Sequence, residues 1–204
     1  KYCKIDVKKT AIIPSFVNSL HLTKNISKKR NNFIYVGRLS EEKGIVPLLN
    51  IIKDLPKIKL TVIGSGPLKS IVNEYKEYKN ITIIGFLPHK EIYKYIKGAL
   101  FMIIPSIWYD VLPNALIESF ACSIPVIVPE SAGMKKLVIE NKTGMLFQNG
   151  DFLDLRTKIL NAFKYKKKAL IMGEYAYKTY RKKYLENIHF KVLMKNYEKI
   201  TSKV

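Results

Sequence analysis

Six short apolar segments alternate with segments of helical pattern along most of this 204-residue chain, and this alternation strongly constrains the fold. The apolar segments are rich in β-branched residues and almost continuously apolar, as is typical of strands buried on both faces of a sheet. Strands that alternate with helices predict a parallel, doubly wound α/β sheet. The expected strands span 33–37, 59–64, 80–86, 99–105, 124–129 and 143–148.

Helical patterns fill the intervals between these strands and continue beyond the last one. Pro113 is expected to be the first residue of its helix, because proline lacks the N–H that an interior helical residue donates. Asp151, which follows Gly150, is expected to cap the next helix. The expected helices lie near 46–54, 67–78, 89–97, 113–122, 132–139, 151–163, 165–182 and 188–203.

Three parts of different character follow from this pattern. Residues 1–31 are lysine-rich and lack the alternation, so we expect the end of a preceding domain or a linker. Residues 32–163 form the expected ligand-binding α/β domain, and residues 164–204 form additional C-terminal helices. The chain begins with Lys1 in the middle of a pattern, and we expect it to be part of a longer protein.

Composition predicts a folded protein that interacts with anions. Hydrophobic residues make up 48% of the chain, enough for a core, and no apolar run is long enough for a transmembrane helix. No signal peptide is recognisable at the start. The net charge of +20 favours nucleic acid, an anionic membrane surface or phosphorylated ligands as partners.

The charge is concentrated near the end of the chain. Residues 163–204 contain twelve Lys and Arg against three Glu, together with six of the thirteen Tyr. A basic, aromatic-rich segment is compatible with an anionic lipid surface, and an ordinary solvated helical face is the alternative. The two cysteines, Cys3 and Cys122, have no partner at a metal-ligand spacing and indicate a reducing compartment. We therefore expect a cytoplasmic protein, peripheral at the inner face of a membrane.

Residues after the strands are candidate ligand contacts, because open α/β sheets bind ligands at the carboxyl ends of their strands. Arg38 and Lys43 follow the first strand and provide two cations suited to a diphosphate. The alternative is that both are ordinary exposed bases in a strongly basic protein.

The segment after the fourth strand, "WYDVLPNALIESFA" (108–121), contains two carboxylates around a helix start. An anion can dock at the free amides of Asn114 and Ala115, and Glu118 lies about one turn further along the same face. Glu118 could therefore accept hydrogen bonds from a ribose, and Asp110 from a second sugar. The alternative is that Glu118 is a satisfied helix carboxylate and Asp110 forms a turn.

Four motifs together resemble a known family. They are "GRLSEEKG" (37–44), "IGSGP" (63–67), "DVLPNALIESFACSIPVI" (110–127) and "KTGMLF" (142–147). Residues 11–163 resemble the C-terminal, donor-binding domain of GT-B glycosyltransferases of family GT4. The resemblance implies a Rossmann-like domain, the C-terminal half of a GT-B fold, that ends in helices packed toward an N-terminal domain. It also implies that a hexosyl group passes, with retention of configuration, from a UDP- or GDP-sugar to a glycan or lipid-linked acceptor in surface polysaccharide synthesis.

The resemblance also implies the roles of individual residues. The candidate catalytic residues are Arg38 and Lys43 on the diphosphate, Glu118 on the ribose and Asp110 on the transferred sugar. Two residues depart from the family pattern, since Asp110 replaces Glu and Val111 replaces Gly, which leaves the donor sugar open. The residues implied to bind the donor are Gly37, Gly64, Gly66, Pro67, Gly85, Phe86, Val111, Leu112, Pro113, Asn114 and Ala115. We expect no cofactor and no metal, because the chain lacks an Asp-x-Asp pair.

Competing functions have weaker support in the sequence. A dinucleotide-binding oxidoreductase is disfavoured because Lys69 stands where its third glycine belongs. A basic α/β module for nucleic acid or for another nucleotide is the alternative, although no nucleic-acid motif is present. A phosphosugar epimerase or phosphorylase would lack the paired carboxylates. We expect His21, His89 and His189 to have surface or packing roles, and Trp108 to anchor its loop by packing.

Overall fold

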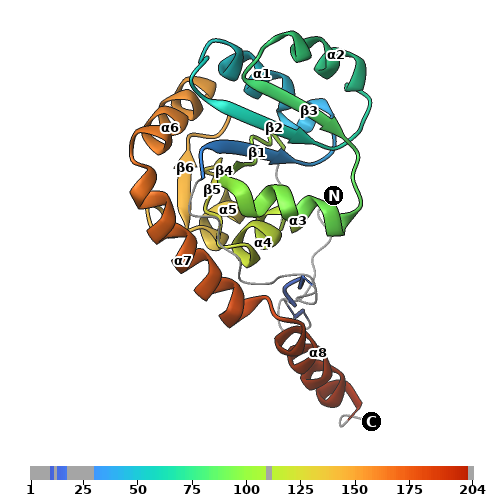
Figure 1. Cartoon of the computed structure of the whole chain (residues 1–204). Helices are drawn as coiled ribbons and strands as arrows, with labels where there is room; N and C mark the ends of the chain where they lie inside the picture. Colours follow the sequence, from blue (N-terminus) through green and yellow to red (C-terminus); the bar gives the residue numbers. More distant parts are fainter. Residues whose placement is uncertain (1–9, 12, 18–29, 109–111, 202–204) are drawn as a thin grey trace.

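The structure, a computed structural model, describes residues 10–11, 13–17, 30–108 and 112–201. Six strands form one sheet, in which every pairing is parallel and the order is β3-β2-β1-β4-β5-β6 (Figure 1). Each strand lies within two residues of its predicted bounds, which confirms the parallel doubly wound sheet. The strands are β1 (Asn32–Val36), β2 (Lys59–Ile63), β3 (Ile81–Gly85), β4 (Ala99–Ile103), β5 (Val126–Pro129) and β6 (Gly144–Phe147).

Helices connect the strands and continue after β6, as predicted. They are α1 (Ile45–Lys53), α2 (Lys69–Glu74), α3 (His89–Gly98), α4 (Asn114–Ala121), α5 (Ala132–Leu137), α6 (Phe152–Lys164), α7 (Lys166–Lys183) and α8 (Glu186–Thr201). The helix predicted at 67–78 is divided into α2 and the short 3-10 helix η4 (Tyr75–Glu77). A second 3-10 helix, η3 (Glu41–Lys43), precedes α1. The predicted cap at Asp151 is confirmed, because its carboxylate accepts from the amides of Leu153 and Asp154.

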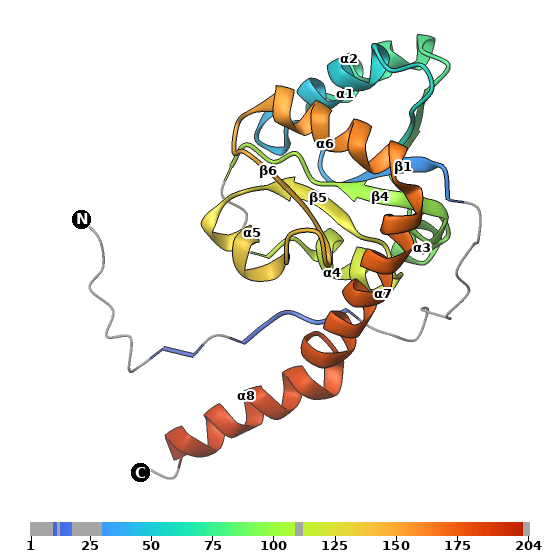
Figure 2. The ribbon, with the colours of Figure 1, turned by 90° about the vertical axis from the view of Figure 1, so that its left-hand side faces the viewer.

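Helices cover both faces of the sheet (Figure 2), because successive side chains of each strand point to opposite sides. On β1, Phe33 and Tyr35 enter the core beneath α1, α2 and α6. Ile34 enters the opposite core, formed with α3, α4 and α5. The unbroken apolar strands of the sequence therefore reflect burial on both faces.

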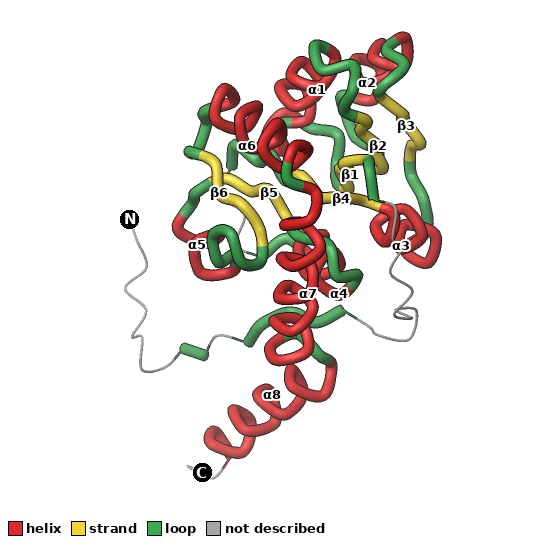
Figure 3. The backbone as a smooth tube through the Cα atoms, turned by 60° about the vertical axis from the view of Figure 1, so that its left-hand side comes forward, coloured by secondary structure: helices red, strands yellow, loops and turns green. Residues whose placement is uncertain are grey.

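Helix α7 joins the two cores as it runs down the molecule (Figures 1 and 3). Met172 belongs to the first core, whereas Tyr180 belongs to the second. Gly173 lies between them, and a Cβ there would be 2.2 Å from the carbonyl oxygen of Ser123. The glycine therefore permits α7 to lie directly against the turn between α4 and β5.

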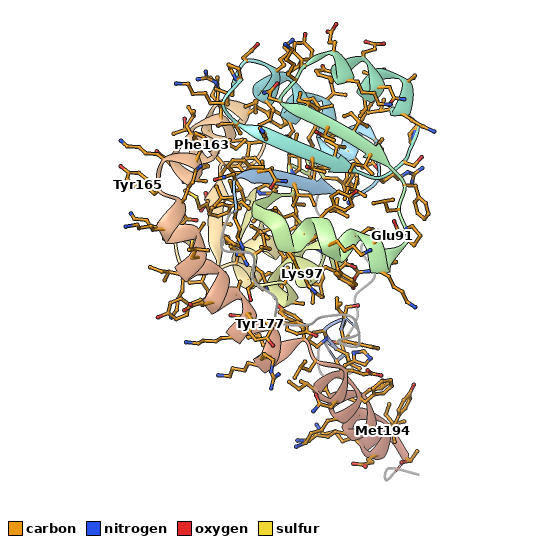
Figure 4. All side chains as sticks on the ribbon, in the orientation of Figure 1. Glu91, Lys97, Phe163, Tyr165, Tyr177 and Met194 are labelled. Carbon is orange, nitrogen blue, oxygen red and sulfur yellow. The ribbon has the colours of Figure 1, made fainter. Side chains whose placement is uncertain are left out.

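Helix α8 extends away from the α/β body, and none of its residues is buried (Figure 1). Met194, labelled in Figure 4, is 52% exposed far from the sheet. Near its start, α8 contacts residues 13–17: His189 Nδ1 lies 2.7 Å from the carbonyl oxygen of Pro14, and its ring packs on Phe16. Within the described part of the chain, no helix combines the length and apolarity needed to cross a membrane.

Candidate functional site

The strand order places a topological switch point between β1 and β4. The chain leaves β1 toward α1 on one face of the sheet and leaves β4 toward α4 on the other. At such a switch point the connections diverge and leave room for a ligand beyond the carboxyl ends of the strands. The described loops at this point are residues 37–44, which contain the basic pair, and residues 104–108 and 112–113, which precede α4 and its Glu118.

The two loops lie against each other. The backbone amides of Ile107 and Trp108 donate to the carbonyl oxygen of Glu42, at 2.9 and 3.3 Å. Gly44 has φ of 65°, and a Cβ at this position would be 2.1 Å from the carbonyl oxygen of Pro105. Glycine is required at this contact because another residue would meet both backbone strain and a clash.

Arg38 and Lys43 belong to the loop after β1, at its exposed start and at the end of η3. Between them, the Ser40 hydroxyl donates to Glu42 Oε1 at 2.6 Å. This hydrogen bond lowers the pKa of Glu42, and the positive charges of Arg38 and Lys43 act in the same direction. Both cations therefore lie near enough to the Glu42 carboxylate to influence its pKa.

The turn after β2 packs closely against the turn after β1. Gly64 has φ of 148°, and a Cβ there would lie 1.8 Å from the carbonyl oxygen of Gly37. Its amide donates to the carbonyl oxygen of Gly85, at the end of β3, over 2.8 Å. Gly66 similarly lies against the backbone of Leu39, whereas Pro67 is exposed. The glycines named in the sequence thus allow three successive strand ends to meet.

A cavity of about 310 Å³ opens beside these turns. Four residues predicted from the sequence line it, namely Gly37, Arg38, Gly64 and Phe86. The ring of Phe86 is 77% exposed, so an aromatic face is available at the cavity. The remaining lining residues are Val36, Ile63, Ser65, Leu87, Pro88, His89 and Ile92.

Helix α4 begins one residue later than predicted. Pro113 is the N-cap rather than the first helical residue, since its ψ of 126° is extended and its carbonyl oxygen accepts from the amide of Leu116. A proline φ near −65° is compatible with either position, so the sequence alone did not separate them. Among the described residues no side chain caps this helix start, and the first amides, those of Asn114 and Ala115, have no acceptor within the helix.

Glu118 lies one turn into α4 and is only 5% exposed. Its Oε1 is 3.2 Å from Nδ1 of His89, the first residue of α3. Burial raises the pKa of Glu118, while the charge and the hydrogen bond of His89 act in the opposite direction. The carboxylate therefore contacts a side chain that lines the cavity.

The sequence did not predict the contact between His89 and Glu118, and the prediction for Trp108 was wrong. His89 was expected to have only a surface or packing role, yet it follows the end of β3 in "GFLPHKE" (85–91), where the strand-end rule already pointed to ligand contacts. The Trp108 side chain is 70% exposed, so it does not pack as expected. The backbone amides of Ile107 and Trp108 anchor this loop instead.

The cavity lining includes only some of the residues predicted from the sequence. Asp110 and Val111 lie outside the described residues. The Leu112 side chain lines a different cavity of about 780 Å³, which includes Ile13 and His189. No group of three or more His, Cys, Asp or Glu with metal-binding geometry occurs in the part of the chain that the structure describes.

Several known glycosyltransferases are similar to this chain in sequence. The uncharacterized glycosyltransferase MJ1178 of Methanocaldococcus jannaschii is 27% identical over 144 residues, which cover 69% of this chain and 40% of the relative. The putative teichuronic acid biosynthesis glycosyltransferase TuaC of Bacillus subtilis is 32% identical over 105 residues, which cover 51% of this chain and 26% of the relative. The chain therefore corresponds to less than half the length of these relatives.

Solved structures share the fold. Sucrose-phosphate synthase from Thermosynechococcus elongatus superposes with a TM-score of 0.82 at 23% identity, over 94% of this chain and 53% of that one. Anabaena HepE, in complex with UDP, superposes with a TM-score of 0.70 at 17% identity, over 84% of this chain and 49% of HepE. The profile of the family "Glycosyl transferases group 1" matches residues 19–179. With four fifths of its length in that match, the chain belongs to the glycosyl transferases group 1 family.

Proposed function

We propose that this chain is the donor-binding half of a glycosyltransferase that takes a sugar from a UDP- or GDP-sugar. The proposal rests mainly on one observation: the basic loop after β1 lies against the loop that leads into α4. The nucleotide complex of HepE, a protein of the same fold, agrees with a nucleoside diphosphate as the ligand.

The chemistry of sugar transfer explains why these two elements need to meet. The leaving group is a nucleoside diphosphate, on which negative charge develops as the sugar departs. Arg38 and Lys43 would neutralise this charge, and the free amides at the start of α4 would add the positive end of a helix dipole. Charge stabilisation of this kind needs no metal, so we infer metal-independent transfer without a resident cofactor.

The rest of the donor would occupy the cavity beside Phe86 and reach toward Glu118. An ionised Glu118 can accept hydrogen bonds from the ribose hydroxyls. Phe86 and the backbone at Gly85 would flank the base, and the transferred sugar would contact Asp110 and Val111. Family membership favours retention of configuration at the anomeric carbon.

The acceptor would bind to an N-terminal domain beyond this chain, which we infer from the shorter length of the chain relative to its relatives. Helix α8 would pack toward that domain, because it has exposed apolar residues on one side. These residues are Phe190, Met194, Tyr197 and Ile200. The name of TuaC refers to teichuronic acid biosynthesis, and we infer a glycan or lipid-linked acceptor in surface polysaccharide synthesis. The basic tail would then hold the enzyme to the cytoplasmic face of an anionic membrane.

Calorimetry with UDP and GDP tests the donor-binding role directly. We expect binding of at least one nucleotide, and we expect Arg38→Ala to weaken it about 30-fold. A charge-assisted contact to phosphate contributes about 2 kcal/mol, which corresponds to that factor. Lys43→Ala should weaken binding similarly.

Arg156→Ala and Lys76→Ala are the matched controls, because both side chains are exposed and belong to α6 and η4. Neither should change the affinity. Absence of heat with both nucleotides at millimolar concentration, or equal losses in the control variants, would contradict the proposal.

A further inference from the structure

The contact between His89 and Glu118 has no part in the proposed function as stated above. Its two side chains differ sharply in exposure, since 77% of the His89 side chain is accessible and only 7% of the Glu118 side chain. His89 lines the cavity together with Phe86, whereas Glu118, on α4, is not a lining residue and contacts the cavity through His89. His89, the first residue of α3, therefore contacts both the cavity and the buried carboxylate.

Three titratable groups in the described part of the chain interact with Glu118. They are His89 and Tyr93 from α3 and Cys122, the C-cap of α4. Burial raises the pKa of both Tyr93 and Cys122, so these two are neutral near pH 7. Of these three groups, His89 is the one that can present a cation or a strong N–H donor to the carboxylate.

A carboxylate offers more acceptor positions than one histidine uses. His89 engages Oε1, which leaves Oε2 of Glu118 for another donor. A ligand hydroxyl in the cavity can supply that donor if the carboxyl group is ionised. A protonated carboxyl group has one O–H that donates and therefore fewer positions that accept a hydrogen bond.

We propose that His89 is a positioning residue for Glu118: its Nδ1 holds Oε1 and leaves Oε2 to accept a ribose hydroxyl. This inference rests on the proposed function, because it assigns the ligand of Glu118 as the ribose of a nucleotide. It predicts that affinity depends on pH through Glu118 and that His89 sets the pH at which affinity falls.

The sign of this dependence follows from the environment of Glu118. Burial raises its pKa, so on acidification Glu118 becomes protonated at a higher pH than an exposed carboxyl group would. The affinity for a ribonucleotide should therefore begin to fall at that higher pH. His89 opposes the rise, and its removal would raise the pKa of Glu118 further. The acidic limb of the binding profile should then move to higher pH.

The first experiment measures UDP and 2′-deoxy-UDP affinity by calorimetry between pH 5 and 8. His89→Ala should weaken UDP binding about tenfold near neutral pH, move the acidic limb upward and affect 2′-deoxy-UDP much less. His89→Asn, which retains an N–H near the Nδ1 position, should restore part of the affinity. His189→Gln on α8, which loses a contact to Pro14, is the control and should bind as the native protein does.

A second measurement needs no ligand. Carbon-13 NMR titration of the Glu118 carboxyl group should give a higher pKa in His89→Ala than in the native protein. Because the His89 side chain is 77% exposed, this variant removes little packing and should fold. A role limited to stability would change the melting temperature and leave both the titration and the pH profile unchanged.

The outcomes separate this inference from the proposed function. If the native protein binds UDP through Arg38 but His89→Ala weakens UDP and 2′-deoxy-UDP equally with an unshifted limb, the positioning role is wrong and donor binding stands. If the native protein binds no nucleotide, the proposed function fails, and the ribose assignment fails with it. An unchanged Glu118 titration in His89→Ala would overturn the inference in either case.

Discussion

Burial controls the titratable side chains around α4, and the consequence is most direct for Cys122. The residue is 6% exposed, and burial raises the pKa of its thiol to about 12. At pH 8 roughly one thiol in 10⁴ is then ionised, against about one in four for a free cysteine. Alkylation of Cys122 in a Cys3→Ser variant should therefore be about a thousandfold slower in the folded protein than in denaturant, as measured with a thiol-reactive dye. Equal rates in the two conditions would contradict this environment.

Glu118 should also make stability depend on pH. Its pKa is higher in the folded state than in the unfolded chain, where it is about 4.3. Between the two values the folded state binds more protons, so the free energy of unfolding falls as pH rises through that window. Glu118→Gln should remove this fall in urea unfolding between pH 4 and 7. Glu91→Gln, at an exposed residue of α3, is the control. If the fall of the free energy of unfolding with pH persists in Glu118→Gln, another group causes it.

At the scale of elements, the turns after β1 and β2 depend on glycine. Gly64→Ala would place a Cβ 1.8 Å from the Gly37 carbonyl oxygen at φ of 148°. We expect the free energy of unfolding to fall by more than about 2 kcal/mol. Nucleotide binding should be lost as well. Gly98→Ala at the end of α3 meets no atom within 4 Å and should change stability by at most about 1 kcal/mol. Similar stability of the two variants would show that the turns can relax.

The N-cap of α6 gives a second test at this scale. Asp151 Oδ1 accepts from the amides of Leu153 and Asp154, both at 2.9 Å. Asp151→Ala should lower the free energy of unfolding by about 1 kcal/mol in chemical denaturation. Asp54→Ala, at an exposed residue after α1, should have little effect. An equal loss in both variants would assign the effect to net charge rather than to the cap.

At the scale of the whole molecule, positive charge gathers on α7 and α8. We expect the chain to sediment with vesicles that contain anionic lipid and not with neutral vesicles. Replacement of Lys167, Lys182 and Lys195 by Glu should reduce binding at least about tenfold, since each basic residue near such a surface contributes about 1 kcal/mol. Binding should also weaken as salt rises.

The matched control reverses three lysines at the other end of the molecule, Lys57, Lys76 and Lys79, all exposed. It changes the net charge equally and should retain most of the binding. Equal binding to neutral vesicles, or equal losses in the two triple variants, would remove the electrostatic argument for the tail.

The amino-acid sequence alone determined the sheet and the location of the candidate site. Apolar segments without alternation gave all six strands within two residues, because burial on both faces leaves a strong local pattern. The rule that ligands bind at strand ends then selected Arg38, Lys43 and the segment around Glu118. These conclusions needed only information carried by neighbouring residues.

The tertiary structure decided which residues meet across elements. It brought His89 of α3 to Glu118 of α4, and it laid the backbone of Ile107 and Trp108 on Glu42. It also showed that Pro113 is the N-cap of α4, whereas the sequence predicted it to be the first residue of that helix. Contacts between distant segments depend on how helices pack on the two faces of the sheet, and that packing leaves no periodic trace in either segment.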